Sequence, residues 1–149
     1  MKLKPIVLTT WWFDPIHSGH VEHFNFAKQY WELFVWLNSD DWLINKKGKN
    51  FMSRKERSYI IENLSSVDFV FGFDDNDWSA CKAILKIYEF FGEERDIIFV
   101  KWGDRTKDNI PEVWICEDLG IEIIYDVWPS WKVQSSSELL KKRKEWIYN

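Results

Sequence analysis

The chain of 149 residues has few cysteines, no long apolar run and little excess charge. Its two cysteines, Cys81 and Cys116, lie far apart, which argues against a disulfide framework and against a Cys-x-x-Cys metal pair. No stretch approaches the roughly 20 apolar residues of a membrane span, and no signal-peptide region precedes the first apolar run. A net charge of −4 gives no support to general nucleic-acid binding. We therefore expect a single cytoplasmic domain, residues 1–149, that binds neither nucleic acid nor membrane.

Short apolar runs alternate with amphipathic segments along the whole chain. The apolar runs predict strands at residues 5–9, 32–37, 67–73, 96–100 and 121–127. The amphipathic segments predict helices at residues 21–30, 54–64, 80–90, 111–119 and 136–146. Ser53 is a good N-cap for the second of these helices, and Glu56 completes a capping box with it. This alternation predicts an α/β domain with a five-stranded parallel sheet, in which ligands bind at the carboxyl ends of the strands.

The motif His17-Ser18-Gly19-His20 lies between the first apolar run and the first predicted helix. The start of a helix offers unpaired backbone N–H groups and the positive end of the helix dipole, and both favour an anion. Two imidazoles add hydrogen-bond donors, and Gly19 lets the backbone approach a ligand closely. A metal site is an alternative, but no third or fourth ligand follows at zinc-like spacing. A packing role is the other alternative, and the motif as a whole favours a polyphosphate.

Several segments, taken together, carry a resemblance to a known family. Residues 13–20 resemble the F-D-x-x-H-x-G-H signature of the cytidylyltransferase-like nucleotidyltransferases. That group includes phosphopantetheine adenylyltransferase, glycerol-3-phosphate cytidylyltransferase and the adenylyltransferase domain of ADP-heptose synthase, and the chain is most similar to the last two. The other landmarks follow in the family's order at residues 37–40, 52–57, 67–70, 103–106 and 134–137. The resemblance implies a three-layer Rossmann-like fold of the HxGH nucleotidyltransferase type.

The resemblance implies an enzyme that moves a nucleoside monophosphate from ATP or CTP to a phosphorylated sugar or polyol and releases pyrophosphate. ATP and a sugar 1-phosphate are the favoured pair, because residues 38–40, 67–68 and 103–106 are closer to the ADP-heptose synthase type. CTP with an alcohol phosphate is the rival within this class. A nucleotide-binding module that has lost turnover is the alternative from another class. The resemblance also implies Mg²⁺ bound with the triphosphate, no metal ligand from the protein itself, and a homodimer.

The same resemblance assigns roles to individual residues. The catalytic candidates are His17, His20, and Lys46 or Lys47. The nucleotide-binding candidates are Thr9, Thr10, Phe13, Asp14, Gly19, Asp104, Arg105, Ser135, Ser136 and Ser137. The candidates for the acceptor are Asp40, Arg54 and Arg57. Plainer roles stay open: a solvated basic turn for the lysines, an exposed helix position for the arginines, an N-cap among the serines and a turn cap for Asp104. Asp14 is expected to orient its loop rather than to do chemistry.

Eleven tryptophans are a heavy load for this length, and their placement is unusual. By resemblance, relatives carry glycine at or beside Trp11, Trp12, Trp31, Trp36, Trp102, Trp128 and Trp131. Glycine provides a positive φ and room beside the backbone, whereas tryptophan provides neither and adds a large apolar surface. Stacking on a nucleotide base accounts for one or two of these residues, and deliberate redesign is another explanation. Our preferred hypothesis is that UGA codons that specify glycine are translated here as tryptophan, and UGG codons in the coding DNA would disprove it.

Overall fold

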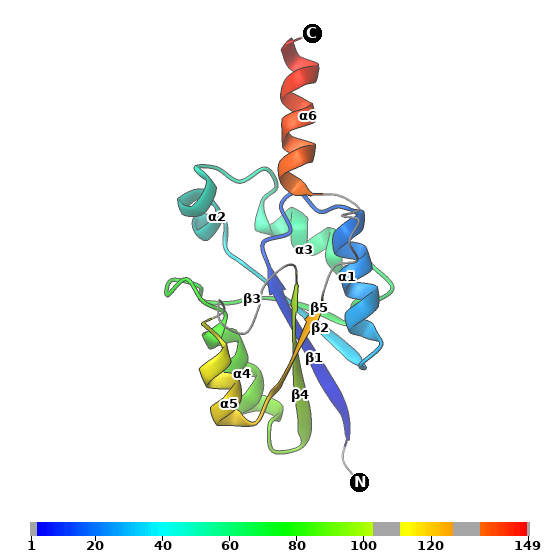
Figure 1. Cartoon of the computed structure of the whole chain (residues 1–149), viewed down its shortest axis with the longest axis vertical. Coiled ribbons are helices and arrows are strands. Elements are labelled where there is room, and N and C mark those ends of the chain that lie inside the picture. The colour runs from blue at the N-terminus through cyan, green and yellow to red at the C-terminus, as the bar shows by residue number, and fades with distance from the viewer. Residues whose placement is uncertain (1–2, 103–110, 127–134, 149) are drawn as a thin grey trace.

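A computed structural model describes residues 3–102, 111–126 and 135–148 (Figure 1). Its strands form a parallel sheet in the order β3-β2-β1-β4-β5. They are β1 (Leu3–Trp11), β2 (Glu32–Leu37), β3 (Phe69–Gly72), β4 (Arg95–Trp102) and β5 (Glu122–Asp126). Each overlaps a predicted strand, with β1 and β4 longer than predicted, and the predicted five-stranded parallel sheet is confirmed.

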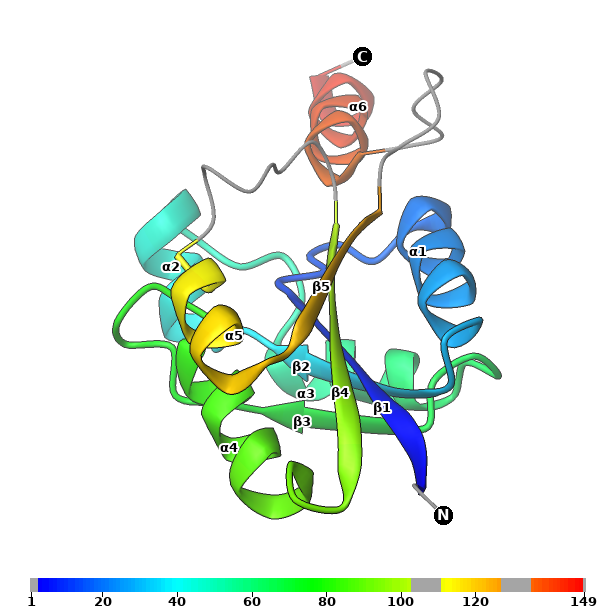
Figure 2. The same cartoon turned by 60° about the horizontal axis from the view of Figure 1, so that its bottom comes forward.

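Helices cover both faces of this sheet (Figure 2). The helices are α1 (Ser18–Lys28), α2 (Asp40–Lys47), α3 (Arg54–Glu62), α4 (Cys81–Phe91), α5 (Val113–Leu119) and α6 (Ser136–Tyr148). Alternate side chains of β1 serve the two faces, because Ile6 and Leu8 pack with α4 and α5 whereas Val7 packs with α1 and α3. The predicted three-layer fold is therefore confirmed. None of the helices in the described ranges combines the length and the apolar character needed to cross a membrane.

The sequence predicts no helix at α2, because the basic, glycine-containing residues 46–50 indicate a loop. Ser39 is its N-cap and accepts a backbone N–H from the first turn at 3.0 Å, and Gly48 ends it with a φ of 85°. Only Leu43 of this helix is buried, so the sequence has no apolar periodicity to reveal it. Lys46 and Lys47 consequently lie in the last turn of a helix and not in a loop.

Two helix starts are set by side chains. Helix α1 begins at Ser18, three residues before the predicted start, because His17 supplies its N-cap. Helix α3 begins as predicted, and the hydroxyl of Ser53 accepts the backbone N–H of Glu56 at 3.2 Å. Both starts lie at the end of the sheet where the strands finish (Figure 1).

The order of the strands defines where a ligand would enter. Strand β1 lies between β2 and β4, and the chain moves outward from it in both directions. Doubly wound sheets bind ligands in the crevice at such a switch point, outside the carboxyl ends of the strands. Here those ends are Trp11 of β1 and Trp102 of β4.

Candidate nucleotide site

His17 and His20 lie side by side at the start of α1. Their rings are stacked, with centroids 3.7 Å apart and an interplanar angle of 26°. The Nδ1 atom of His17 accepts the backbone N–H of Gly19 at 3.1 Å. The Nδ1 atom of His20 accepts the backbone N–H of His17 at 3.1 Å, which completes a capping box made of two histidines. The start of the helix therefore fixes both imidazoles in place.

These hydrogen bonds determine which ring nitrogen carries the proton. A neutral imidazole has one donor and one acceptor nitrogen, so an Nδ1 that accepts leaves the proton on Nε2. In His20 that Nε2 is buried and has no hydrogen-bond partner. Burial, with smaller effects from His17, His23 and Lys47, lowers the pKa of His20 from 6.5 to about 2. The site thus holds a neutral N–H donor, beside the positive end of a helix dipole, for an anion that enters.

The buried neutral ring of His20 makes the stability of the chain depend on pH. The folded chain holds His20 neutral down to a pKa of about 2, whereas the unfolded chain protonates it near 6.5. Stability is therefore fully present above 6.5 and falls as the pH falls below that value. Between pH 7 and pH 5 we expect this ring to lower the free energy of unfolding by about 2 kcal/mol.

Urea unfolding at both pH values, for the parent chain and for His20→Gln, measures this effect. Glutamine keeps an oxygen that can accept the capping N–H but does not titrate. The variant should lose less stability than the parent between the two pH values, and equal losses would contradict the neutral buried ring.

Asp14 holds the loop that precedes the histidines. Its carboxylate is buried and accepts the backbone N–H groups of Phe51 at 2.8 Å and Met52 at 2.7 Å. Because both oxygens bind backbone, this geometry supports the orienting role expected for Asp14. The neighbouring Phe13 is also buried and meets the ring of His20 edge-on, with centroids 5.0 Å apart. Phe13 is therefore a packing partner of the histidine.

The two candidate lysines in the last turn of α2 point to different places. The Nζ atom of Lys47 donates to the carbonyl oxygen of Asp14 at 3.4 Å and lies 4.7 Å from the ring centre of Trp12. Burial is the main cause that lowers the pKa of Lys47; Asp14 opposes this effect and Arg57 adds to it. Lys46 instead lines a separate cavity. Lys47 is thus the lysine that the fold brings to the loop before the histidines.

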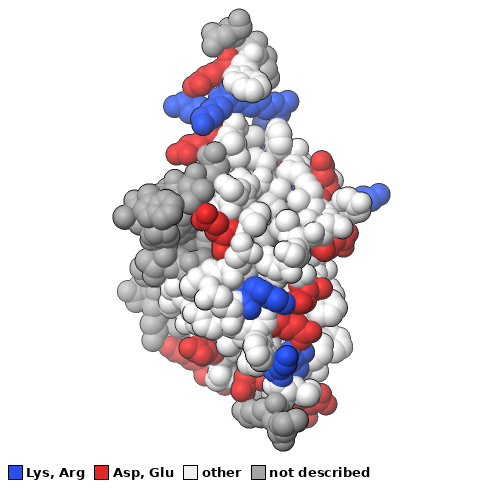
Figure 3. Space-filling model, turned by 90° about the vertical axis from the view of Figure 1, so that its right-hand side faces the viewer, with Lys and Arg blue, Asp and Glu red and all other residues white. Residues whose placement is uncertain are grey.

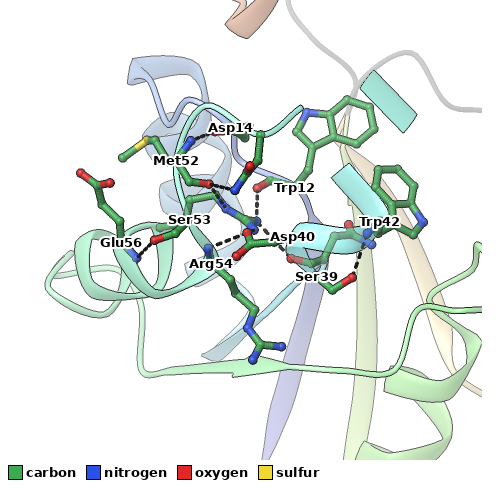
Figure 4. Close-up of polar contacts among 12 residues, drawn as sticks. Trp12, Asp14, Ser39, Asp40, Trp42, Met52, Ser53, Arg54 and Glu56 are labelled. Atoms are coloured by element: carbon green, nitrogen blue, oxygen red, sulfur yellow. Dashed lines mark hydrogen bonds and ion pairs between the residues drawn. The ribbon is translucent and has the colours of Figure 1, made fainter. Parts of the chain in front are cut away.

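Arg57 is fully buried and donates to groups within the protein. Figure 4 shows three of its partner residues, Trp12, Met52 and Asp40, close together. Its Nη1 donates to the carbonyl oxygens of Trp12 at 2.7 Å and Asn38 at 3.1 Å, and its Nε donates to that of Met52 at 3.3 Å. Its Nη2 pairs with Asp40 at 2.8 Å. These contacts join the ends of β1 and β2 to the start of α3. The arrangement favours a positioning role for Arg57 over the predicted contact with an acceptor phosphate.

Arg54 and Asp40 also lie apart from the histidine pair. The carboxylate of Asp40 accepts the backbone N–H of Arg54 at 2.7 Å. Both residues line an open groove of about 1070 Å³ between α3 and the end of β3. The side chain of Arg54 extends toward β3 and away from Asp14 (Figure 4). This groove contains neither histidine, so we place the candidate site by the chemistry of the histidine pair and not by the size of the hollow.

The two threonines at the end of β1 differ in their surroundings. The hydroxyl of Thr9 is buried and donates to the carbonyl oxygen of Val100 at 3.0 Å, so the Nε2–H of His23 donates to it at 2.7 Å. His23 was not predicted, although its spacing of three residues from His20 places it on the same side of α1. Thr9 therefore connects β1 to β4, whereas Thr10 lines a cavity.

The start of α6 lies against the same loop. The hydroxyl of Ser136 is buried and donates to the carbonyl oxygen of Pro15 at 2.9 Å. The hydroxyl of Ser135 accepts the backbone N–H of Glu138 at 3.2 Å, which identifies the N-cap expected among the serines. Ser137 is exposed. The contact of Ser136 brings the N-terminus of α6 close to the residues that precede His17.

The rest of α6 extends away from the sheet (Figure 1). Its basic run at residues 141–144 is exposed. Basic surface gathers at this end of the molecule in Figure 3. An exposed basic run on a projecting helix is typical of a solvated helix face.

A cavity of about 150 Å³ lies at the carboxyl ends of β1 and β4. Lys101 and Glu112, two residues that were not predicted, line it together with Thr10 and Lys46. One carboxylate oxygen of Glu112 accepts the backbone N–H of Ala80 at 2.8 Å, and the other lies 4.0 Å from the Nζ of Lys101. Their sequence separation of eleven residues gave no signal that they would meet. The following predicted residues lie outside the described ranges: Asp104, Arg105, Trp128 and Trp131.

A doubly wound parallel sheet, with a fixed histidine pair at the N-terminus of its first crossover helix, defines an α/β domain suited to a phosphate-bearing ligand. The chain belongs to the cytidylyltransferase-like family, whose model matches residues 12–146. The resemblance read from the sequence is therefore confirmed at the level of the family.

Curated relatives share part of their length with this chain. The bifunctional protein HldE of Syntrophotalea carbinolica is 32% identical over 126 residues, which are 81% of this chain and 24% of that protein. The HldE protein of Aliarcobacter butzleri is 36% identical over 119 residues, 78% of this chain and 23% of that protein. The chain thus spans about a quarter of the length of these relatives.

A solved structure confirms the fold. The lipopolysaccharide core biosynthesis protein from Thermoplasma volcanium GSS1 superposes with a TM-score of 0.63 and 20% identity, covering 86% of this chain and 98% of that one.

Proposed function

We propose that the chain is a nucleotidyltransferase that moves a nucleoside monophosphate from ATP or CTP to a phosphorylated sugar or polyol and releases pyrophosphate. The observation that carries the proposal is the buried Nε2–H of His20, which has no partner and lies beside His17 at a helix N-terminus. A desolvated donor of this kind needs an acceptor, and a phosphate oxygen supplies one. The resemblance of residues 38–40 and 67–68 to the ADP-heptose synthase type favours ATP and a sugar 1-phosphate as the substrates.

The proposed reaction needs little covalent help from the protein. An oxygen of the acceptor phosphate attacks the α-phosphorus of the nucleotide, and the bond from that phosphorus to the bridging oxygen breaks. Pyrophosphate leaves with the bonding electrons, and no proton has to be removed because the attacking oxygen is already anionic. Positioning and charge stabilisation then supply most of the rate.

The residues of the site have distinct tasks in this proposal. His17 and His20 donate to the oxygens of the α-phosphoryl group as negative charge builds there. Lys47 adds a positive charge from the last turn of α2, and the N-terminus of α6 receives the remaining phosphates. Asp14 holds the loop, and the resemblance assigns Asp104 and Arg105 to nucleotide binding.

Mg²⁺ would arrive with the triphosphate, whose oxygens and water are its preferred ligands. Within the described ranges no three histidine, cysteine or acidic side chains gather as a metal cluster. Bound to the phosphates, Mg²⁺ would neutralise the charge of the leaving pyrophosphate.

Pyrophosphate release tests the proposal. The chain is incubated with Mg²⁺, each of the four nucleoside triphosphates, and a panel of sugar 1-phosphates and polyol phosphates. We expect release that depends on both substrates and is largest with ATP and a sugar 1-phosphate. Release that is largest with CTP and an alcohol phosphate would overturn the preference, and binding without release would favour a module that has lost turnover.

The binding module is the second candidate function. The observation that favours it is the ring of Trp102, whose centroid lies 4.7 Å from that of His20. This indole packs against the imidazole whose Nε2 the phosphates would need. A cytoplasmic location and a homodimer are further parts of our proposal.

A further inference from the structure

Indoles stand at the ends of both central strands, beside the crevice at the switch point of the sheet. Trp11 ends β1 and Trp102 ends β4, and their rings meet edge to face with centroids 5.4 Å apart and an interplanar angle of 88°. The ring of Trp12 lies 4.4 Å from that of Trp11, and the ring of Trp102 lies 4.7 Å from that of His20. A doubly wound sheet binds its ligand in this crevice. The indoles therefore occupy the space between the two central strands from which a ligand would reach the histidines.

The backbone at two further tryptophans has a conformation that favours glycine. Trp31 has a φ of 135° and Trp78 a φ of 62°. Of the described non-glycine residues, only Phe13 shares this property. A bulky residue with a positive φ is strained, and glycine adopts the same conformation without a clash. Both indoles are exposed, by 44% at Trp31 and 53% at Trp78. Their burial therefore compensates for little of the backbone strain.

Two indoles, one buried at Trp36 and one half-buried at Trp42, lack the hydrogen bond that tryptophan normally makes. The Nε1 atoms of Trp36 and Trp42 are buried and have no partner. A buried indole N–H usually finds an acceptor, because its desolvation is otherwise uncompensated. Crowding, backbone strain and unpaired N–H groups are independent observations, and each is made at a different pair of tryptophans. The fold is thus poorly matched to indoles at several of these positions.

We infer that Trp11 and Trp102 close the nucleotide crevice in this chain, and that the backbone at Trp31 and Trp78 is built for glycine. Glycine at the two crevice positions opens a path for a nucleoside triphosphate to His17 and His20. This inference rests on the proposed function for the identity of the ligand. It is also the pattern that UGA codons translated as tryptophan instead of glycine would produce.

The first experiment measures nucleotide binding by calorimetry with Mg²⁺ and either ATP or CTP. We compare the parent chain with Trp11→Gly/Trp102→Gly, and with Trp114→Ala/Trp146→Ala as the matched control. The control removes two indoles that are 80% and 87% exposed. We expect the opened variant to bind at least about tenfold more tightly than the parent and the control. Equal affinity in all three proteins would overturn the inference.

Glycine weakens a strand, so the opened variant is checked for folding by circular dichroism. If it does not fold, Trp11→Ala/Trp102→Ala replaces it, because alanine removes the same indoles and leaves the strand propensity less disturbed. Binding of nucleotide without pyrophosphate release by the opened variant would support the inference while overturning the proposed function. Pyrophosphate release by the parent at the same rate as by the variant would overturn the inference while supporting the proposed function.

The second experiment measures the thermal stability of Trp31→Gly and Trp78→Gly, each against the alanine variant at the same position. Both members of each pair lose the same indole, so the difference reports the backbone alone. We expect each glycine variant to have a Tm a few degrees higher than its alanine counterpart. An equal or higher Tm for the alanine variants would overturn the backbone part of the inference.

Discussion

Replacing His20 by alanine is expected to lower the rate of pyrophosphate release by about 100-fold or more, because one preorganised donor to the developing charge is lost. The effect should fall on kcat, since the donor acts most strongly when charge builds on the α-phosphoryl group. The measurement is steady-state release at saturating nucleotide. It is made in whichever form turns over, the parent chain or the Trp11→Gly/Trp102→Gly variant.

The side chain of His20 also takes part in the capping box of α1, so loss of activity must be separated from loss of folding. His20→Gln retains an acceptor for the capping N–H of His17 and serves as the matched control for the helix start. We expect it to fold with nearly parental stability at pH 7 and still to lose most of its turnover. Full turnover in a folded His20→Ala protein would contradict the assigned role, and unfolding of both variants would instead indicate a packing role.

Replacing Arg57 by alanine is expected to destabilise the fold by about 3–5 kcal/mol, because several buried carbonyl oxygens lose their donor at once. These oxygens belong to Trp12, Asn38 and Met52. Removal of the guanidinium also leaves a cavity where β1, β2 and α3 meet. Urea unfolding measures the loss.

Lys55→Ala provides the matched control for Arg57, because Lys55 is an exposed basic residue on the same helix. Its expected change is within about 0.5 kcal/mol. Arg57→Lys should recover only part of the stability, since an ammonium cannot reproduce the fork that reaches three elements. A stable Arg57→Ala protein with weakened binding of the acceptor would contradict the positioning role and favour the phosphate contact predicted from the sequence.

Local signals made the framework of the fold predictable. Apolar runs identified the strands, and Ser53 identified the start of α3, because a cap is a short-range interaction that its own sequence specifies. The histidine motif predicted an anion site at the start of α1, and the structure brings the two rings together there. Helix α2 escaped prediction because its stability depends on capping by Ser39 and Gly48 and not on an apolar stripe.

Burial could not be predicted for single polar residues. Arg57 resembles an exposed helix arginine in sequence, yet the segments that cover it come from the ends of β1 and β2. The choice between Lys46 and Lys47 likewise depends on which face of an unpredicted helix turns toward Asp14. The tautomer of His20 follows from a backbone contact, which no residue pattern specifies.

The coding DNA offers a direct check on the tryptophans. The hypothesis of a codon-reading exchange predicts UGA at Trp11, Trp12, Trp31, Trp36, Trp102, Trp128 and Trp131. The positive φ of Trp78 adds that position. UGG at these positions would disprove the hypothesis and leave the closed crevice as a property of the encoded protein.

Our central claim is that His17 and His20 bind the phosphates of a nucleotide through Nε2. The chain has only three histidines, so their ring nitrogens can be followed individually by NMR after selective ¹⁵N labelling. On titration of the Trp11→Gly/Trp102→Gly variant with Mg²⁺ and ATP, the account predicts that the Nε2 signals of His17 and His20 shift while the ring of His20 stays neutral. Saturation by nucleotide that leaves both Nε2 signals unchanged would contradict it.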